Sequence, residues 1–134
     1  DAVRSLIAGG DIKSAHDCSE GGLAVCLAES CISQLAVRDL PRLIGATIDL
    51  TDAAAGARLD ALLFGETQHR IVVTTPALQA AKVVAQAQLL GVPARVIGRV
   101  GGDRLALKTA GGEWSWPVTE LHDSWWNAIA RAMA

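Results

Sequence analysis

Residues 14–30, SAHDCSEGGLAVCLAES, change character at two consecutive glycines. The segment Ile12 to Asp17, before them, is predicted to be a short strand, and residues 18–21 are predicted to be a turn. Beyond the turn, apolar side chains recur at helical spacing from about Gly22 to Ser33. This helix is apolar nearly all round, which predicts that it is buried.

Further strands and helices are predicted along the rest of the chain. HRIVVTT, residues 69–75, is the clearest strand because β-branched residues dominate it and Pro76 bounds it. Gly101-Gly102-Asp103, between two alternating segments, indicates a hairpin. The other predicted strands are Leu43–Leu50, Ala94–Val100, Arg104–Thr109 and Glu113–Trp116, and the other predicted helices are Val3–Ala8, a short helix ending at Leu62 with Asp49, Thr51 or Asp52 as its cap, Ala77–Leu90 and Thr119–Met133.

The order of these elements predicts the fold class. From residue 43 to 109 it is strand, helix, strand, helix, strand, strand, a ferredoxin-like order; a strand–helix unit precedes this core and a helix follows it. Aliphatic residues outnumber aromatic ones, which suits helices packed on a sheet. We therefore expect an α/β (α+β) fold, with one mixed β-sheet covered by helices in a single domain over residues 1–134.

Composition and charge exclude several classes of partner. The net charge of -2 and the absence of a Lys or Arg run argue against nucleic acid. No apolar stretch approaches the roughly 20 residues that span a bilayer, so no membrane association is expected. Cys18, Cys26 and Cys31 match no zinc pattern, which favours reduced core thiols in a cytoplasmic protein. Because the chain does not begin with Met, we expect it to be a piece of something longer.

The segment HDCSEGG, residues 16–22, is the first candidate site. A strand that ends at Asp17, two glycines and an apolar helix can direct backbone N–H groups at an anion, and Ser19 can donate one more hydrogen bond. The same residues also suit an ordinary turn and helix cap, and on the residues alone this structural interpretation is favoured. Since His16, Asp17 and Ser19 are sequence neighbours, a Ser–His–Asp triad is not expected.

The segment LFGETQHR, residues 63–70, is the second candidate. Its glycine, placed just before a buried strand, can present Glu66, Thr67 and Gln68 as an exposed polar ledge for a ligand hydroxyl or amide. The alternative is an ordinary helix-to-strand connection, in which Glu66 is solvated and Arg70 pairs with a carboxylate. Glu66 could act as a general base only if a pocket raised its pKa.

All four tryptophans lie in the last 21 residues, counted from Trp114. Trp114 and Trp116 are expected on one face of a strand. In the closing helix, the side expected to form the core stripe carries Leu121, Trp125, Ala128 and Ile129, and core packing accounts for some of the tryptophans. Trp126 should point elsewhere and suits a contact with another domain or subunit.

Taken together, the two motifs carry a resemblance to a known family. SAHDCSEGGLAVCLAES and LFGETQHRIVVTT, followed by GVPARVIGRVGG, resemble the carboxy-terminal domain of the phosphoribosylformylglycinamidine synthase family. More broadly, the chain resembles the second domain of the aminoimidazole ribonucleotide (AIR) synthetase superfamily, with its selenophosphate synthetase, thiamine monophosphate kinase and hydrogenase-maturation branches. The similarity extends from about Val3 to the end and implies an AIR synthase C-terminal-domain-like fold.

This resemblance implies a ligase reaction in purine biosynthesis. In that family ATP phosphorylates the amide oxygen of formylglycinamide ribonucleotide, and ammonia from glutamine then displaces phosphate to leave an amidine. The ATP site, the magnesium-binding carboxylates and the catalytic histidine belong largely to the preceding ATP-binding domains, and a glutaminase domain or subunit is a further partner. The resemblance thus implies no catalytic or metal-binding residue here, no ligand bound to this chain alone, and inactivity in isolation. His16 is not expected to be the catalytic histidine.

The resemblance also assigns the binding residues. The synthase is an internal duplication, and HDCSEGG resembles its second half, which implies a structural or auxiliary role. The implied residues face an interdomain cleft: Asp17, Ser19, Gly21 and Gly22 in the glycine turn, and Phe64, Gly65, Glu66, Thr67 and Gln68 in the loop that corresponds to the one touching substrate in the productive half.

Two alternatives stay open. The chain can belong to a sister ATP-dependent branch of the superfamily, such as hydrogenase maturation, which lacks the duplicated half. It can also be a non-enzymatic regulatory module of ferredoxin-like shape that binds a small molecule, for which the strand and helix order from 43 to 109 suffices.

Overall fold

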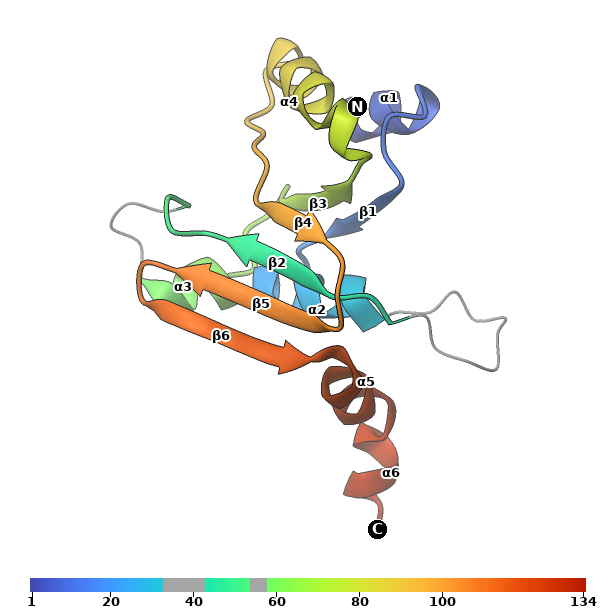
Figure 1. The fold of residues 1–134 in the computed structure, drawn as a ribbon, viewed down its shortest axis with the longest axis vertical. Helices are drawn as coiled ribbons and strands as arrows, with labels where there is room; N and C mark the ends of the chain where they lie inside the picture. The colour runs from blue at the N-terminus through green and yellow to red at the C-terminus, as the bar shows by residue number, and fades with distance from the viewer. Residues whose placement is uncertain (33–42, 54–57) are drawn as a thin grey trace.

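The structure is a computed structural model that describes residues 1–32, 43–53 and 58–134 (Figure 1). In chain order its elements are α1 (Ala2–Ala8), β1 (Ser14–Asp17), α2 (Gly22–Ile32), β2 (Ala46–Asp49), α3 (Leu59–Phe64), β3 (Ile71–Thr74), the 3-10 helix η1 (Ala77–Gln79), α4 (Ala80–Leu89), β4 (Gly98–Val100), β5 (Arg104–Thr109), β6 (Gly112–Pro117), α5 (Val118–Trp126) and α6 (Ala128–Ala132).

The described strands form two sheets. A four-stranded sheet has the order β4-β2-β5-β6, in which β2 is parallel to β5 and the other neighbours are antiparallel. The predicted mixed sheet with covering helices is thereby confirmed. β1 and β3 instead pair with each other as a separate two-stranded antiparallel sheet, which the sequence did not indicate.

The hairpin predicted at Gly101-Gly102-Asp103 is wrong. β4 and β5 both pair with β2, which lies between them, and not with each other. The connection passes around the start of β2, where Gly45 N–H donates to the Gly102 carbonyl and Gly101 N–H donates to the Gly45 carbonyl, both at 2.8 Å. A Cβ atom on Gly45 would lie 2.4 Å from the Arg104 carbonyl oxygen, so a glycine is needed for β2 to enter between its neighbours.

Helix boundaries also differ from the prediction. α3 begins at Leu59, with no side-chain cap, and the Asp49 carboxylate instead accepts a hydrogen bond from Thr51 N–H at 2.9 Å. The bonds from Thr51, with a smaller effect of Lys108, lower the pKa of Asp49. The single closing helix predicted at Thr119–Met133 is two helices, α5 and α6, with Asn127 between them. Ser33 and residues 54–57, which fall in predicted helices, lie outside the described residues.

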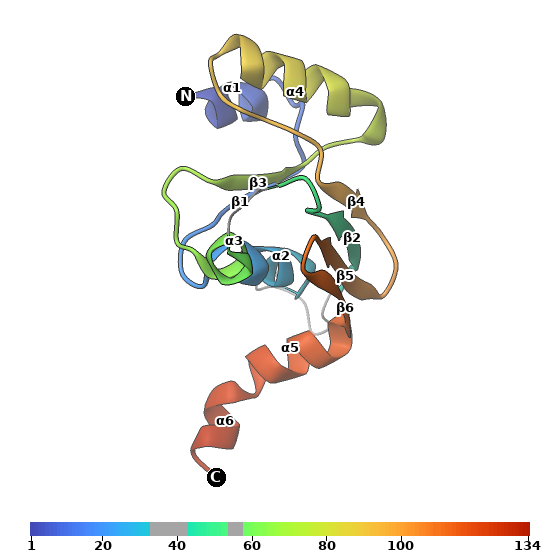
Figure 2. The same cartoon turned by 90° about the vertical axis from the view of Figure 1, so that its left-hand side faces the viewer.

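The main core lies between the four-stranded sheet and α2, which covers one face of the sheet (Figure 2). Alternate residues of β2 and β5 point to this face, as expected for a half-buried sheet. α2 is buried as predicted. The described helices cover only one face of the four-stranded sheet. The buried cluster comprises Cys18, Leu23, Cys26, Leu27, Cys31, Ile32, Ala46, Ile48, Leu50, Leu63, Leu105, Leu107 and Val118.

A second, smaller packing layer lies beyond β1 and β3. α1 and α4 lie side by side there, on the opposite side of the two-stranded sheet from α2 (Figures 1 and 2). Val83 and Ala87 of α4 are buried. The buried Asp11 carboxylate pairs with Lys82 Nζ at 2.5 Å, which ties the segment after α1 to α4.

The predicted core side of the closing helix is mostly wrong. Leu121 packs on the main core, beside the buried Val118. Trp125, Ala128 and Ile129 are exposed, because α5 leaves the body of the molecule after its first turns and α6 continues outward (Figure 2). Trp114 and Trp116 do share one face of β6, since they pair in register with Leu107 and Leu105.

Burial of the cysteines has a chemical consequence that can be measured. Cys18, Cys26 and Cys31 are all buried. Burial, followed by the neighbouring Cys18, raises the pKa of the Cys26 thiol to about 12, and burial also raises the pKa of Cys31. Because the thiolate is the reactive form, both thiols should be poor nucleophiles in the folded protein.

We predict that iodoacetamide at about pH 8 alkylates Cys26 at least about 100-fold more slowly in the folded chain than in the denatured chain, because almost no thiolate is present. Mass spectrometry of the Cys26 peptide measures both rates, and the denatured sample is the control. Equal rates in the two samples would contradict the buried position of this thiol.

Candidate functional site

Pairing of β1 with β3 brings the two motifs together. Asp17 lies opposite Ile71, and Cys18 N–H donates to the Arg70 carbonyl at 2.8 Å. Because the two strands are antiparallel, the residues that follow β1 lie beside the residues that precede β3. The glycine turn, residues 17–22, and the FGETQ loop, residues 64–68, are therefore at the same end of this sheet.

Backbone contact at Gly22 joins the two loops. Gly22 is buried and has a φ of 70°, in the left-handed region. A Cβ atom on Gly22 would lie 2.7 Å from the Phe64 carbonyl carbon and 2.9 Å from the Leu63 carbonyl oxygen. Only glycine therefore permits this approach of α2 to the end of α3, for reasons of both conformation and space.

A hydrogen bond from Gly21 completes the contact. Gly21 N–H donates to Glu66 Oε1 at 3.0 Å, across 45 positions of sequence. A carboxylate at the N-terminus of a helix is favoured by the helix dipole and by the free N–H groups there. Glu66 thus supplies, from within the chain, a negative charge at the position where the sequence suggested an external anion. It is exposed, as the ordinary-connection alternative expected, but it is bonded to the turn.

The other predicted site residues surround this contact. Gly65 directly follows α3, and its N–H donates to the Ala61 carbonyl at 3.1 Å. Ser19 accepts a hydrogen bond from Gly22 N–H at its carbonyl, at 3.3 Å, so its backbone shapes the turn. The structure brings Gly21, Gly22, Phe64 and Glu66 into direct contact. The other predicted side chains in the two loops are exposed to solvent: Asp17, Ser19, Thr67 and Gln68.

Three interactions near this site were not predicted. His16 Nε2 lies 2.8 Å from Glu29 Oε2 on α2, and His16 Nδ1 lies 3.7 Å from Asp17 Oδ1, so a half-buried histidine stands between two carboxylates. Periodicity places Glu29 on α2 but does not indicate its partner on β1. Arg70 donates to the Leu62 carbonyl at 3.4 Å, and among the described residues it forms no ion pair with a carboxylate, which one interpretation expected.

His69 has an unusual backbone conformation. Its φ of 67° lies in the left-handed region, which non-glycine residues seldom adopt. The predicted strand at residues 69–75 accordingly starts later, at Ile71. A sequence pattern does not show which non-glycine residue adopts a left-handed backbone conformation, so this turn could not be predicted.

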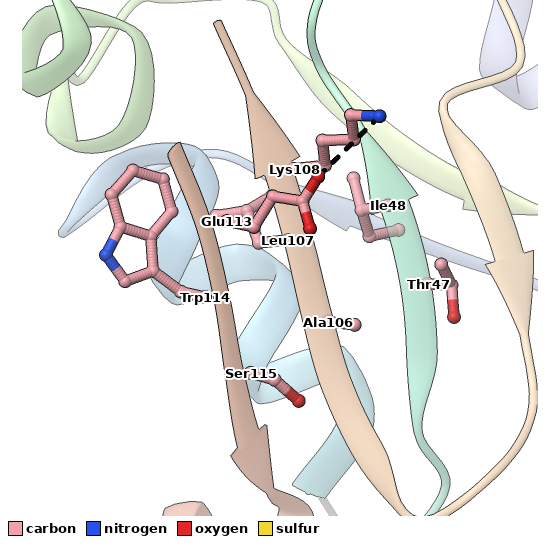
Figure 3. A pocket seen from close by; sticks show the side chains of 8 residues that line it. All are labelled: Thr47, Ile48, Ala106, Leu107, Lys108, Glu113, Trp114 and Ser115. Atoms are coloured by element: carbon pink, nitrogen blue, oxygen red, sulfur yellow. Dashed lines mark ion pairs between the residues drawn. The ribbon is translucent and has the colours of Figure 1, made fainter. Parts of the chain in front are cut away.

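A depression of about 300 Å³ lies elsewhere, on the uncovered face of the four-stranded sheet (Figure 3). Lys108 Nζ and Glu113 Oε1 lie 3.6 Å apart at its edge. None of the predicted site residues lines it; its lining is Thr47, Ile48, Ala106, Leu107, Lys108, Glu113, Trp114 and Ser115. In the described ranges, no group of three or more His, Cys, Asp and Glu side chains could hold a metal ion. No helix there is long and apolar enough to cross a bilayer.

A pair of glycine substitutions tests the backbone contact. Gly10 has a φ of 69°, like Gly22, but a Cβ atom there would meet nothing within 4 Å. We predict that Gly10→Ala lowers the free energy of unfolding by about 1–2 kcal/mol, the left-handed cost alone. Gly22→Ala should lower it by about 2–5 kcal/mol, because the backbone of Phe64 must also move.

Denaturant unfolding of both variants and the parent chain measures this difference. Gly10→Ala is the matched control for conformation without contact. If the two variants are equally destabilised, Gly22 does not make the close approach described.

Comparison with known proteins identifies close relatives. The family described as AIR synthase related protein, C-terminal domain, matches residues 1–109. Phosphoribosylformylglycinamidine synthase subunit PurL of Anaeromyxobacter dehalogenans strain 2CP-C is 43% identical over 131 residues, which are 96% of this chain and 16% of the relative. The PurL subunit of Thermomicrobium roseum is 36% identical over 130 residues, 97% of this chain and 16% of the relative. The chain therefore spans about a sixth of the length of these relatives.

Solved structures share the fold. Thermotoga maritima PurL complexed with FGAR superposes with a TM-score of 0.71 at 18% identity, over 90% of this chain and 20% of that chain. The same protein complexed with ATP gives a TM-score of 0.71 at 19% identity, with the same coverage. The expected AIR synthase C-terminal-domain-like fold is thus confirmed. Because the family match extends over most of the chain, from residue 1 to residue 109, this chain belongs to the family of AIR synthase related proteins, C-terminal domain.

Proposed function

We propose that this chain is the carboxy-terminal domain of a phosphoribosylformylglycinamidine synthase. The observation that carries the proposal is 43% identity to a PurL subunit over 96% of the chain. The full enzyme would convert formylglycinamide ribonucleotide, ATP and glutamine-derived ammonia to formylglycinamidine ribonucleotide. Because the chain spans 16% of that relative, the proposed reaction belongs to a longer polypeptide of which residues 1–134 are one domain.

In this proposal the chain contributes one wall of an interdomain cleft. The glycine turn and the FGETQ loop would face the preceding ATP-binding domains, which would carry the ATP site, the magnesium ligands and the catalytic groups. The described residues of this chain do not fit a magnesium site, since no suitable cluster of ligands occurs among them. A glutaminase domain or subunit would deliver ammonia, and the enzyme would act in the cytoplasm.

The geometry of Glu66 supports an auxiliary role for this wall. Its carboxylate already occupies the N-terminus of α2 by accepting from Gly21 N–H at 3.0 Å. A phosphate placed at the same N–H groups would meet a like charge, which is unfavourable. Glu66 would therefore hold the two loops in position, while the exposed Ser19, Thr67 and Gln68 are left to contact a ligand.

A mutant series in the full-length enzyme tests both the reaction and this role. We predict that Ser19→Ala and Glu66→Ala each lower ATP-dependent amidine formation by no more than about 10-fold, because an exposed hydrogen bond contributes about 0.5–1.5 kcal/mol. Glu66→Gln should retain more turnover than Glu66→Ala, since the amide oxygen can still accept from Gly21 N–H. Steady-state kinetics with formylglycinamide ribonucleotide measures each variant.

Glu20→Ala is the control, because Glu20 is an exposed carboxylate in the same turn, adjacent to Gly21. A loss of several powers of ten in a variant whose circular dichroism is unchanged would contradict the auxiliary role. If the unmodified full-length protein forms no amidine from this substrate and ATP, the proposed function itself is wrong.

A further inference from the structure

The carboxy-terminal helices expose a large apolar surface. α5 and α6 project from the body of the molecule and end far from α1 (Figures 1 and 2). No residue of α6 is buried. Exposed fractions are 48% for Trp125, 68% for Trp126, 75% for Ile129 and 82% for Met133. Apolar side chains gathered in this way mark a surface for contact with another protein surface.

We call this surface the tail stripe and define it by five residues: His122, Trp125, Trp126, Ile129 and Met133. Within α5, the spacing of four residues places His122 and Trp126 on one side of consecutive helical turns. Ile129 lies on α6 and Met133 directly after it, both exposed beyond the junction at Asn127. The His122 ring stacks on the Trp126 ring, with centroids 5.9 Å apart and planes 12° apart. The Trp125 and Trp126 centroids are 6.0 Å apart.

Polar bonds on the other side of the helices hold the stripe in place. Asp123 accepts a hydrogen bond from Asn127 Nδ2 at 2.6 Å and forms an ion pair with Arg131. These two partners lower the pKa of Asp123, Arg131 having the larger effect. Because Asn127 stands at the junction of α5 and α6, these exposed bonds favour the observed direction of α6 relative to α5.

The general family domain and the PurL relatives differ in how far along the chain they match. The family match stops at Thr109, before β6, α5 and α6. The alignments with PurL subunits cover 96–97% of the chain, so they extend across α5 and into α6. The tail stripe thus belongs to the part of the chain that the synthase relatives share beyond the general family domain. Those relatives are about six times as long as this chain, which matches 16% of their length.

We infer that the tail stripe docks on an apolar surface of another part of the same synthase polypeptide. This inference rests on the proposed function, because the partner is the remainder of that longer chain. Trp125 and Trp126 suit the centre of such a contact, since large aromatic side chains contribute most of the binding energy at interfaces. His122 and the indole N–H groups can donate hydrogen bonds to carbonyl groups of the partner at the rim.

Hydrogen–deuterium exchange of residues 118–132 tests the docking. In the 134-residue chain, the amides of α6 should exchange quickly, because the helix is short and has no buried residue. In the full-length polypeptide, the same amides should exchange at least about 10-fold more slowly. Trp126→Glu with Ile129→Glu should return exchange in the full-length polypeptide to the rate of the short chain.

Leu78→Glu is the matched control, because Leu78 is 100% exposed and lies on η1, away from the tail stripe. It should leave exchange at residues 118–132 unchanged. The thermal unfolding midpoint of the short chain should be the same with and without the two glutamates, which confirms that these variants fold.

Two results would overturn the inference. One is equal exchange of α6 in the short chain and the full-length polypeptide. The other is slow exchange in the short chain that depends on protein concentration and disappears with the glutamates, because a second copy would then cover the stripe. Normal amidine formation with an unprotected α6 would refute the docking alone, whereas a protected α6 without amidine formation would refute the proposed function alone.

Discussion

The contact between the backbone of Gly22 and that of Phe64 determines where the two polar loops lie. α2 begins at Gly22, and α3 ends at Phe64, so a side chain at this position would separate the helices and the loops attached to them. The antiparallel β1–β3 pair brings the chain to this point from the other side. Four short elements, α2, α3, β1 and β3, none stable by itself, are thereby held in one arrangement by close approach at a single glycine.

This packing places a carboxylate at the N-terminus of α2. With the helices in contact, Glu66 reaches Gly21 N–H and satisfies part of the N-terminus of α2 with the chain's own carboxylate. The site therefore differs from an open phosphate cradle, even though its glycines and helix are those that a cradle requires. A wall of this kind positions exposed polar groups without carrying the reacting charges, which agrees with the proposed auxiliary role.

Local sequence patterns predicted local structure, but they did not predict which distant segments pair. The alternation in β5 and the apolar run of α2 were sufficient to predict a half-buried strand and a buried helix. Gly101-Gly102-Asp103 indicated a hairpin, but β2 separates the two strands, because partner choice in a sheet depends on the whole chain. Similarly, the motifs predicted Glu66 and Gly21 as candidate site residues, whereas the bond between them, and the one between His16 and Glu29, arises only from the fold.

The most direct measurement of this account is the nuclear Overhauser effect between Gly22 and Phe64 in the 134-residue chain in solution. The account predicts strong cross-peaks between the Gly22 α-protons and the backbone protons of Phe64, because a Cβ atom at Gly22 would lie within 2.8 Å of Phe64 Cα. Absence of these cross-peaks, while those of the β1–β3 pair remain, would contradict the claim that this contact holds the two loops together.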